Sequence, residues 1–447
     1  MKHRFAPLLA LIVAALATPA FGEVVTLKEA VQRALQSNHL LKAASFEKGA
    51  AQQEVAVSRS RYFPRLSLQS GVVLSNTPSS VFMMKLDEGR ISPARDFAAD
   101  TLNNPSPRGD FKTAVTLEQP LLDFDISTGV ALAGKGAEAA DFSEQAKREE
   151  VAFRVYLAYL GVRKAQAYGQ VAEQALVNAR EHDRLAALRE KDGIGLKSDR
   201  LRTATSVADA EQRVVATKND LLLSRMRLNL VVGGPQGGTL DIGEPRKLEE
   251  PSLELEQLIA QAQQNRPDLK VAENSVQRGE LAVQRAERAY LPTLYASGSY
   301  QLNDRDLPFG TDKDSWTVGV NLRWELFDGM RRSHEKEKAE LTRKGAAEVL
   351  ENERREVALQ VTESVLHRQE AFLRLETARA AVRDAEESRR LVTLRFGNGL
   401  SSLVEVMDAE TALDRARANL VEVENGYDAA TGEIYFRTGV FLKEVMR

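Results

Sequence analysis

The segment most suggestive of ligand chemistry is glycine-rich and runs from Gly129 to Gly136. A phosphate-binding loop has four residues between two glycines, then a lysine, then a serine or threonine whose hydroxyl binds Mg²⁺. Here Lys135 is followed by Gly136, so the magnesium ligand is missing. The strand expected before this segment also alternates apolar and polar residues, whereas the strand before a phosphate loop is buried. The sequence therefore argues against nucleotide binding.

Carboxylates and imidazoles, which can serve as acids, bases or metal ligands, form no obvious constellation. Asp123 and Asp328 each stand where a strand is expected to pass into a helix, which suits an N-cap or an acid at the positive end of the helix dipole. The histidines lack a partner at short helical spacing; they are His3, His39, His182, His334 and His367. We expect no enzyme, no metal site and no other cofactor.

The composition is that of a folded protein and excludes further classes of function. The chain has 447 residues, 28% charged and 43% hydrophobic, with a net charge of −3. Lysine and arginine are spread along the chain, so no nucleic-acid partner is expected. The absence of cysteine excludes disulfides, thiol catalysis and cysteine-bound metals.

The N-terminus predicts export. Lys2 and Arg4 precede an apolar run from Phe5 to Ala17, and small residues follow up to Gly22. This pattern is typical of a secretory signal peptide over residues 1–22. No later apolar run is long enough for a membrane helix. The mature chain is therefore expected in the periplasm, outside the cell or in the outer membrane.

The same order of elements is expected twice. Tyr62-Phe63-Pro64 ends a helical pattern and opens a strand pattern, and Tyr290-Leu291-Pro292 does so again. We predict a first repeat at 23–235, a linker at 236–251, a second repeat at 252–440 and a tail at 441–447. The first repeat has a helix over about 26–61, strands over about 66–75 and 111–119, a loop at 76–110, and helices over about 123–191 and 198–232. The second has a helix over about 253–290, strands over about 294–302 and 316–326, and helices over about 330–396 and 402–437.

The fourth predicted strand carries the clearest membrane signal. Its apolar face begins at Trp316 and continues to Trp324, and tryptophan favours the two rims of a bilayer. Polar residues such as Lys112, Asn321 and Arg323 would lie on the opposite, wet face. A soluble antiparallel sheet alternates in the same way. If the sheet does face lipid, closure needs about eight strands or more, and therefore two or three chains.

The sequence resembles the TolC-like outer-membrane efflux family over essentially the whole mature chain. The resemblance rests on the duplicated order, the two Tyr-x-Pro corners, Leu326-Phe327-Asp328-Gly329 with its counterpart Leu121-Leu122-Asp123, and the two glycine-leucine turns. It implies a mixed α and β membrane protein. That fold is a homotrimer whose twelve-stranded β-barrel, four strands per chain, lies in outer-membrane lipid and continues as a coiled-coil periplasmic tunnel.

The resemblance also implies partners and site residues. A periplasmic adaptor protein would dock on the helix tips at Gly195, Leu196, Gly399 and Leu400, and would link them to an inner-membrane pump. Glu405 and Asp408 would form an acidic ring at the periplasmic aperture, although the same residues also suit a solvated helix face. Some relatives carry an arginine latch where this chain has Ser401, and Lys197 or Arg200 are candidate substitutes. Ser198 and Ser402 occupy expected N-cap positions.

The sequence thus predicts the outer-membrane channel of a tripartite efflux or export system. It would be a passive exit duct for small molecules such as drugs, toxic compounds or metals, driven by the pump. One alternative is the exit duct of a type I protein secretion system. An alternative of another class is a soluble periplasmic coiled-coil scaffold.

Overall fold

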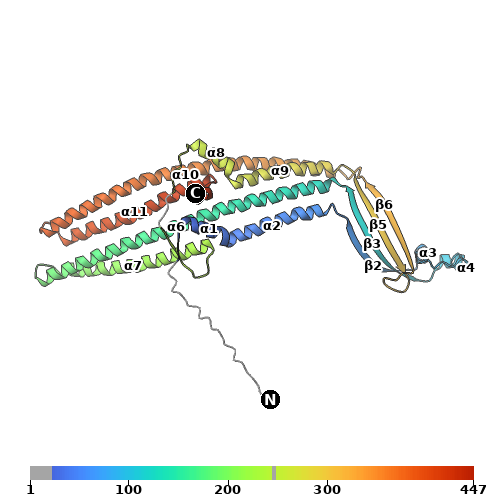
Figure 1. The fold of residues 1–447 in the computed structure, drawn as a ribbon, viewed down its shortest axis with the longest axis horizontal. Coiled ribbons are helices and arrows are strands. Elements are labelled where there is room, and N and C mark those ends of the chain that lie inside the picture. Colours follow the sequence, from blue (N-terminus) through green and yellow to red (C-terminus); the bar gives the residue numbers. More distant parts are fainter. Residues whose placement is uncertain (1–22, 244–247) are drawn as a thin grey trace, which may run out of the picture. The chain divides into compact units, whose positions relative to one another are not determined.

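The structure is a computed structural model that describes residues 23–243 and 248–447. The expected signal peptide, residues 1–22, lies outside the described residues. The described chain divides into two compact units, which we call the helical unit and the sheet unit (Figure 1). Within the described residues, the helical unit comprises 23–43, 145–243, 248–266 and 355–447, and the sheet unit comprises 44–144 and 267–354.

The sheet unit contains one antiparallel sheet with the strand order β2-β3-β5-β6. The strands are β2 (Arg65–Ser75), β3 (Arg108–Leu122), β5 (Thr293–Asp304) and β6 (Lys313–Arg323). They overlap the four predicted segments, but β6 ends before Trp324 rather than near 326. Its partner strand β5 begins only at Thr293, directly after Pro292, so the ladder has no partner for Trp324. The Trp324 indole instead donates a hydrogen bond of 3.0 Å to the carbonyl of Tyr290.

The register separates apolar and polar side chains onto opposite faces. Directly paired residues share a face, so the pairs Leu68–Val115, Val115–Tyr300 and Tyr300–Trp316 lie on one side of all four strands. We call this side the apolar face; it also carries Leu66, Val72, Leu74, Leu117, Leu294, Val318, Val320 and Leu322. The other side, the polar face, carries Gln69, Arg108, Asp110, Lys112, Glu118, Gln301, Asn303, Lys313, Asn321 and Arg323.

Within the sheet unit, helices adjoin the strands at one end of the sheet (Figure 1). They are α2 (His39–Ser60), the start of α6 (Phe124–Lys191), α9 (Pro267–Arg288) and the start of α10 (Arg331–Gly397). Asp125 joins three of these segments, because Arg61 and Arg285 both donate to its carboxylate, at 3.0 and 2.5 Å. At a rise of ~1.5 Å per residue, α6 and α10 are each about 100 Å long.

Two helices predicted as continuous are each divided in two. The segment expected at 26–61 forms α1 (Leu27–Ser37) and α2, separated by Asn38, whose side chain caps the new start by accepting from the N–H of Leu40 at 2.8 Å. The segment expected at 253–290 forms α8 (Leu255–Asn265) and α9. Pro267 explains this second break, because proline disfavours helical geometry at Arg266 before it.

The segment at 76–110, expected as a loop, contains three short helices: α3 (Pro78–Asp87), α4 (Pro93–Asp96) and α5 (Ala99–Asn103). Figure 1 places α3 and α4 at the end of the strands opposite to α2 and α9. Pro78 and Pro93 occupy the first helical positions, where a missing N–H costs nothing.

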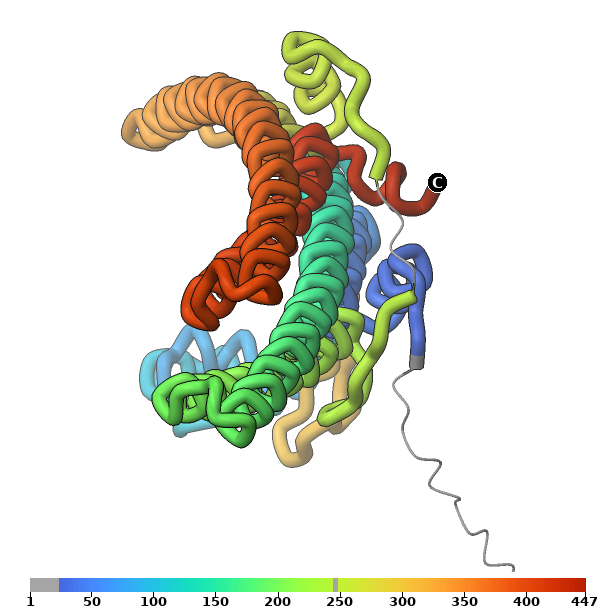
Figure 2. The backbone as a smooth tube through the Cα atoms, turned by 90° about the vertical axis from the view of Figure 1, so that its left-hand side faces the viewer, coloured from blue at the N-terminus to red at the C-terminus, as the bar shows by residue number. Residues whose placement is uncertain are grey.

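The helical unit packs an N-terminal helix, the first long hairpin and the C-terminal segment 429–446 around one apolar core. Its remaining elements are β1 (Glu23–Val25), α7 (Lys197–Val232), β4 (Leu240–Ile242), α11 (Leu403–Arg437) and α12 (Phe441–Met446). The core side chains include Val31, Val151, Val155, Tyr159, Leu228 and Phe441. Burying each large apolar side chain contributes about 1.5–3 kcal/mol. In Figure 2 the turns of both hairpins face the viewer.

The helical unit also contains a parallel pair of short strands. β1 pairs with β4, with Glu23 beside Leu240 and Val25 beside Ile242. β4 lies within the segment 236–251 that was expected to be only a linker. Among residues 23–243 and 248–447, no helix combines the length and apolar character that crossing a membrane requires.

Candidate functional site

The turn between α6 and α7 is tight and presents apolar side chains. Gly193 has a φ of 74°, and the N–H groups of Ile194 and Gly195 both donate to the carbonyl of Arg189, at 3.0 and 2.9 Å. Gly195 must lack a Cβ, because one would lie 2.8 Å from the Arg189 backbone. Ile194 is 79% exposed and Leu196 is 66% exposed. The turn therefore offers a small apolar surface held by a rigid backbone.

The start of α7 differs from the expected capping pattern. The helix begins at Lys197, and its N-cap residue is Leu196, which has no side-chain capping group. The prediction of Ser198 as an N-cap is therefore wrong, since Ser198 already lies inside the helix. Arg200, a candidate latch, instead donates to Asp183 across the hairpin at 3.1 Å, and Thr203 donates to the same carboxylate at 2.9 Å.

The turn between α10 and α11 repeats this geometry. Gly399 has a φ of 73°, and the N–H of Leu400 donates to the carbonyl of Arg395 at 2.8 Å. The Arg395 side chain donates back to the carbonyl of Leu400 at 3.3 Å. Leu400 is 68% exposed. Matched by conformation, Gly399 corresponds to Gly193 and Leu400 to Ile194, because each glycine has a positive φ and each following N–H donates to an arginine carbonyl. Leu196 instead corresponds to the N-cap Ser402, so the expected pairing of Gly195-Leu196 with Gly399-Leu400 is out of register by two residues.

Glu405 is engaged in a capping box at the start of α11. The Ser402 hydroxyl accepts from the N–H of Glu405 at 3.3 Å, and the Glu405 carboxylate accepts from the N–H of Ser402 at 3.2 Å. The expected N-cap role of Ser402 is confirmed. The hydrogen bond that the Ser402 N–H donates to the Glu405 carboxylate has the largest effect on its pKa, followed by the one from the Ser402 side chain. Both hold the pKa of the Glu405 carboxyl below its usual range. Glu405 and Asp408 are both exposed.

A second pair of carboxylates, Glu410 and Asp414, lies further along α11, and no local sequence motif marks it. Glu410 is only 7% exposed; it accepts a hydrogen bond from Asn178 of α6 and lies 3.6 Å from the Arg389 guanidinium of α10. Asp414 follows at i+4. Burial, and next the charge of Glu410, raise the pKa of Asp414 to about 6. This acidic pair therefore lies where α11 packs against both α6 and α10.

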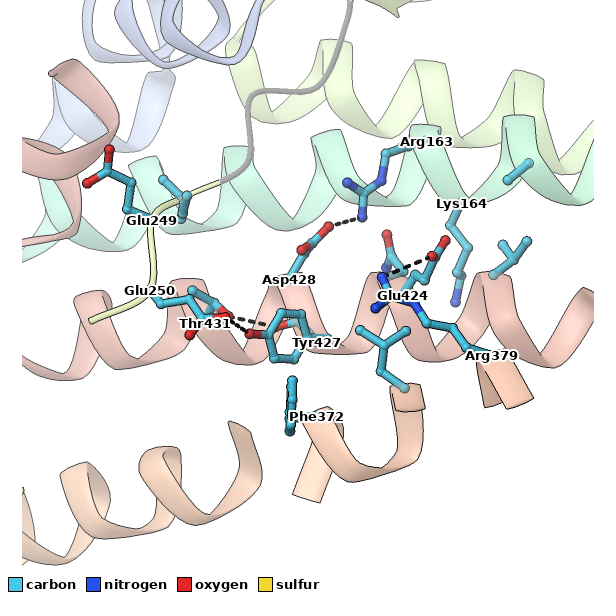
Figure 3. Close-up of a pocket in the computed structure, with 15 residues that line it drawn as sticks. Arg163, Lys164, Glu249, Glu250, Phe372, Arg379, Glu424, Tyr427, Asp428 and Thr431 are labelled. Carbon is cyan, nitrogen blue, oxygen red and sulfur yellow. Dashed lines mark hydrogen bonds and ion pairs between the residues drawn. The ribbon is translucent and has the colours of Figure 1, made fainter. Parts of the chain in front are cut away.

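A cavity of about 560 Å³ lies between α6, α10, α11 and the segment 248–250 (Figure 3). Its charged groups mostly satisfy one another. Arg163 donates to Asp428, and Glu250 accepts from Arg368 at 2.6 Å and from the hydroxyl of Tyr427. This internal pairing favours a structural role, in which the segment 248–250 is fastened to the long helices.

The residues first considered for catalysis have structural roles. Gly129, Lys135 and Gly136 lie inside α6, and Lys135 pairs with Glu138 at 2.6 Å, so no phosphate loop exists here. Asp123 accepts from the N–H of Asp125 at 2.9 Å at the start of α6.

Asp328 plays the same part at the start of α10, where it accepts from the N–H of Arg332 at 3.1 Å. Among the described residues, no cluster of three or more histidines or carboxylates is suited to hold a metal ion.

Comparison with known proteins identifies the chain. A family model described as Outer membrane efflux protein matches residues 30–234 and 258–440. The chain belongs to this family. The two matched segments take in both tip turns, Glu405, Asp408 and the whole four-stranded sheet of this outer membrane efflux protein.

Individual relatives agree with this assignment. The efflux protein is 22% identical over 440 residues to the proteases secretion protein PrtF of Dickeya chrysanthemi, covering 95% of this chain and 90% of that one. It is 22% identical over 430 residues to the outer membrane protein TolC of Escherichia coli, and the match covers 91% of this chain and 80% of that one.

Solved structures share the fold. The VceC outer membrane protein of Vibrio cholerae has a TM-score of 0.74 at 19% identity, with 92% and 96% of the two chains covered. The MtrE channel of Neisseria gonorrhoeae has a TM-score of 0.75 at 17% identity, with 94% and 90% covered.

Family membership fixes the broad function and location. This efflux protein is an outer-membrane exit duct of efflux or secretion systems, with a large periplasmic portion, and its family consists of channels. The alternative of a soluble periplasmic scaffold is thereby set aside. The particular residues expected at the aperture, the docking tips and the membrane interface stay predictions.

Proposed function

We propose that three copies of this chain form a closed twelve-stranded barrel that serves as the passive exit duct of a tripartite efflux system. The observation that carries the proposal is the division of the sheet into an apolar and a polar face. On the apolar face Trp316 is 73% exposed, Val318 74% and Leu68 62%. Such a continuous apolar surface is too costly to leave in water and suits lipid.

The edges of the sheet support association of several copies. β2 and β6 are the two outer strands of the sheet, and each has a partner on one side only. Unpaired edges in a membrane leave backbone groups unsatisfied, so a barrel must close. Pairing β6 of one copy with β2 of the next satisfies these groups, and three copies leave a lumen wide enough for transit. The polar face, with Lys112, Gln301 and Asn321, would line that lumen.

The tip turns are the proposed docking surface for a periplasmic adaptor. Leu196 and Leu400 are exposed, and each follows a glycine whose turn is fixed by backbone hydrogen bonds. A rigid, exposed apolar side chain loses little conformational entropy on binding. The adaptor would connect the duct to an inner-membrane pump, which supplies the energy and selects the substrate.

Glu405 and Asp408 are the proposed lining of the periplasmic aperture. Both carboxylates are exposed near the start of α11, and their threefold repetition would form an anionic ring that favours cations. The capping box does not compete with this role, because one carboxylate can accept from Ser402 and still contribute its charge.

Protein export is the second candidate. A relative named as a proteases secretion protein matches over 95% of this chain, so a type I secretion duct is a specific alternative to small-molecule efflux. Expression in a host that lacks its own duct separates the two. Restored drug resistance indicates efflux, and release of a protein substrate with its cognate pump indicates secretion.

Two neighbouring residues of β6 test the barrel directly. Val318 lies on the apolar face and Thr317 on the polar face, and both are exposed in the single chain. Val318→Lys should place a charge against lipid at a cost of about 2–4 kcal/mol and reduce trimers in outer-membrane fractions. Thr317→Lys should assemble normally and alter conductance in a planar bilayer. Equal tolerance of both substitutions, or a purified chain that is monomeric without detergent, would contradict the proposal.

A further inference from the structure

We propose that the segment between β2 and β3 is a cap over the distal end of the polar face and narrows the outer mouth of the duct. We define this cap as residues 76–107, which include α3, α4 and α5. The inference rests on the proposed function, in which the polar face lines the lumen. It goes further, because it assigns a role to a segment that is not needed to form the sheet.

The contacts of the cap lie on the polar face. The guanidinium of Arg108, a polar-face residue, makes a two-pronged pair with Glu88 just after α3, with Nε 3.3 Å from Oε1. Lys112, also on the polar face, lies 4.0 Å from Asp87. Gly89 approaches the side chain of Lys313, the first residue of β6 on that face. The cap therefore touches β3 and β6 across the width of the sheet.

Two polar side chains of the polar face are buried at this end of the sheet. On the polar face, Asp110 is 0% exposed and Asn303 is 1% exposed, and the Asn303 amide donates to Asp110 at 2.8 Å. A wet lumen would leave Asp110 and Asn303 accessible, so the cap is what covers them.

The cap has its own internal support. Val81 and Met84 of α3 are buried, and Lys85 pairs at 2.9 Å with Asp96, whose side chain is 1% exposed. Phe82 and Phe97 make an edge-on ring contact at 5.7 Å between centroids. These contacts give the cap a defined shape, which distinguishes it from a loop that yields to passing solutes.

A second fastening joins the cap to the loop between β5 and β6. Arg90 pairs with Asp306 at 3.3 Å and with Asp312 at 2.5 Å. These pairs are more exposed than Glu88–Arg108, in which the Glu88 side chain is fully buried. Breaking a buried pair leaves an uncompensated charge, so Glu88–Arg108 is the main fastening.

The location determines what the cap does. Helices α2, α6, α9 and α10 join the sheet at its opposite end, and those helices belong to the periplasmic portion. The capped end therefore faces outward. Three copies of the cap, one over each third of the lumen, would restrict the size of solute that leaves the duct.

Single-channel conductance in a planar bilayer tests the inference. Replacing residues 78–103 with a short Gly-Ser turn should raise the conductance of the trimer by about twofold or more, because it removes the constriction. Glu88→Gln should give a larger, fluctuating conductance and faster tryptic cleavage after Arg90. The charge exchange Glu88→Arg with Arg108→Glu should restore both readouts. Arg305→Gln removes a charge at the same end of the sheet, from a residue that pairs with Asp306 and leaves Glu88–Arg108 intact, and should change neither.

The outcomes separate this inference from the proposed function. A wild-type protein that forms no channel would overturn the proposed function itself. A conducting wild type whose deletion variant inserts with unchanged conductance would overturn the cap alone. If the deletion variant does not assemble, Glu88→Gln still decides, since unchanged conductance and unchanged cleavage after Arg90 would refute the fastening.

Discussion

The guanidinium of Arg189, near the end of α6, lies 4.0 Å from the ring centroid of Phe396, near the end of α10. This cation–π contact joins the two hairpins within the helical unit, next to both tip turns. Because Arg189 also supplies the carbonyl that fixes the first turn, loss of the contact should loosen both turns together.

Arg189→Gln should therefore speed amide hydrogen exchange in residues 192–196 and 398–401. The contact is half-buried, so its loss should cost about 0.5–1 kcal/mol. That cost corresponds to an increase of about two- to fivefold in the exchange rate. Arg184→Gln is the matched control, because within the described part of the chain Arg184 pairs with Glu181 alone, on the same exposed helix surface. Faster exchange in residues 192–196 alone, with no change in residues 398–401, would argue against coupling between the hairpins.

The roles of Glu405 in capping and in charge can be separated. Glu405→Gln keeps an oxygen that accepts from Ser402 but removes the charge, whereas Ser402→Ala removes the cap and keeps the charge. Glu405→Gln combined with Asp408→Asn should reduce cation selectivity, measured as reversal potential across a salt gradient. Ser402→Ala should lower stability by about 1 kcal/mol and leave selectivity unchanged. An unaltered reversal potential in the charge variant would remove both residues from the aperture.

Asp414 predicts a pH dependence of stability. Its pKa of about 6 in the folded chain exceeds that of an unfolded aspartate, so the folded state binds the proton more tightly. The contribution of Asp414 to folding stability is complete below the pKa of an unfolded aspartate, about 3.9, and is lost as pH rises through 6. Glu410 opposes ionisation of Asp414, while Arg417, Arg213 and Arg389 favour it.

The Asp414→Asn variant should therefore become more stable relative to the wild type as pH rises from 5 to 7.5. Because Asp414 is only partly buried, solvent screening limits the difference to about 1 kcal/mol. Thermal unfolding of the two proteins across this range measures it. Parallel pH profiles would show that Asp414 titrates normally.

Two glycines of α11 make a matched pair for packing. A Cβ on Gly432 would lie 2.3 Å from the ring of Tyr156, which is 2% exposed, whereas a Cβ on Gly426 would meet nothing within 4 Å. Gly432→Ala should destabilise the helical unit by about 1–3 kcal/mol through overpacking. Gly426→Ala should be neutral or stabilising by up to about 1 kcal/mol, because alanine favours helix. Thermal unfolding compares them, and equal midpoints would contradict this packing.

The tip leucines test adaptor docking. Leu196→Asp together with Leu400→Asp should abolish efflux in a complementation assay, because a charge replaces the apolar contact. Trimer content of the outer membrane should not change, since both side chains are exposed. Leu230→Asp, at an equally exposed leucine near the other end of α7, is the control. Retained efflux in the double variant would place docking elsewhere.

Much of the fold follows from local sequence signals. Pro64 and Pro292 mark where helices give way to strands, and the alternation within each strand assigns its two faces correctly. Signals carried by partners elsewhere in the chain are less visible. β1 and β4 have three residues each, too few for a period, and their pairing depends on the packed helical unit.

The site is predictable to a similar extent. The glycine-leucine turns and the Ser402 cap are visible as short motifs, since their hydrogen bonds join residues close in sequence. Glu410 and Asp414 could not be distinguished from other acids on α11, because their burial depends on α6 and α10. The segment 76–110 is predicted as a loop because prolines, glycines and polar residues are typical of loops, although Pro78 and Pro93 each begin a helix.

The pairing of β1 with β4 has a consequence for how the protein matures. Secretion delivers a chain from its N-terminus, so Glu23–Val25 emerges long before Leu240–Ile242. The first strand must remain without its partner while everything from Thr26 to Thr239 crosses the inner membrane. Completion of the helical unit is thus a late event in biogenesis, and a chain stalled before Leu240 would arrive with its first strand still unpaired.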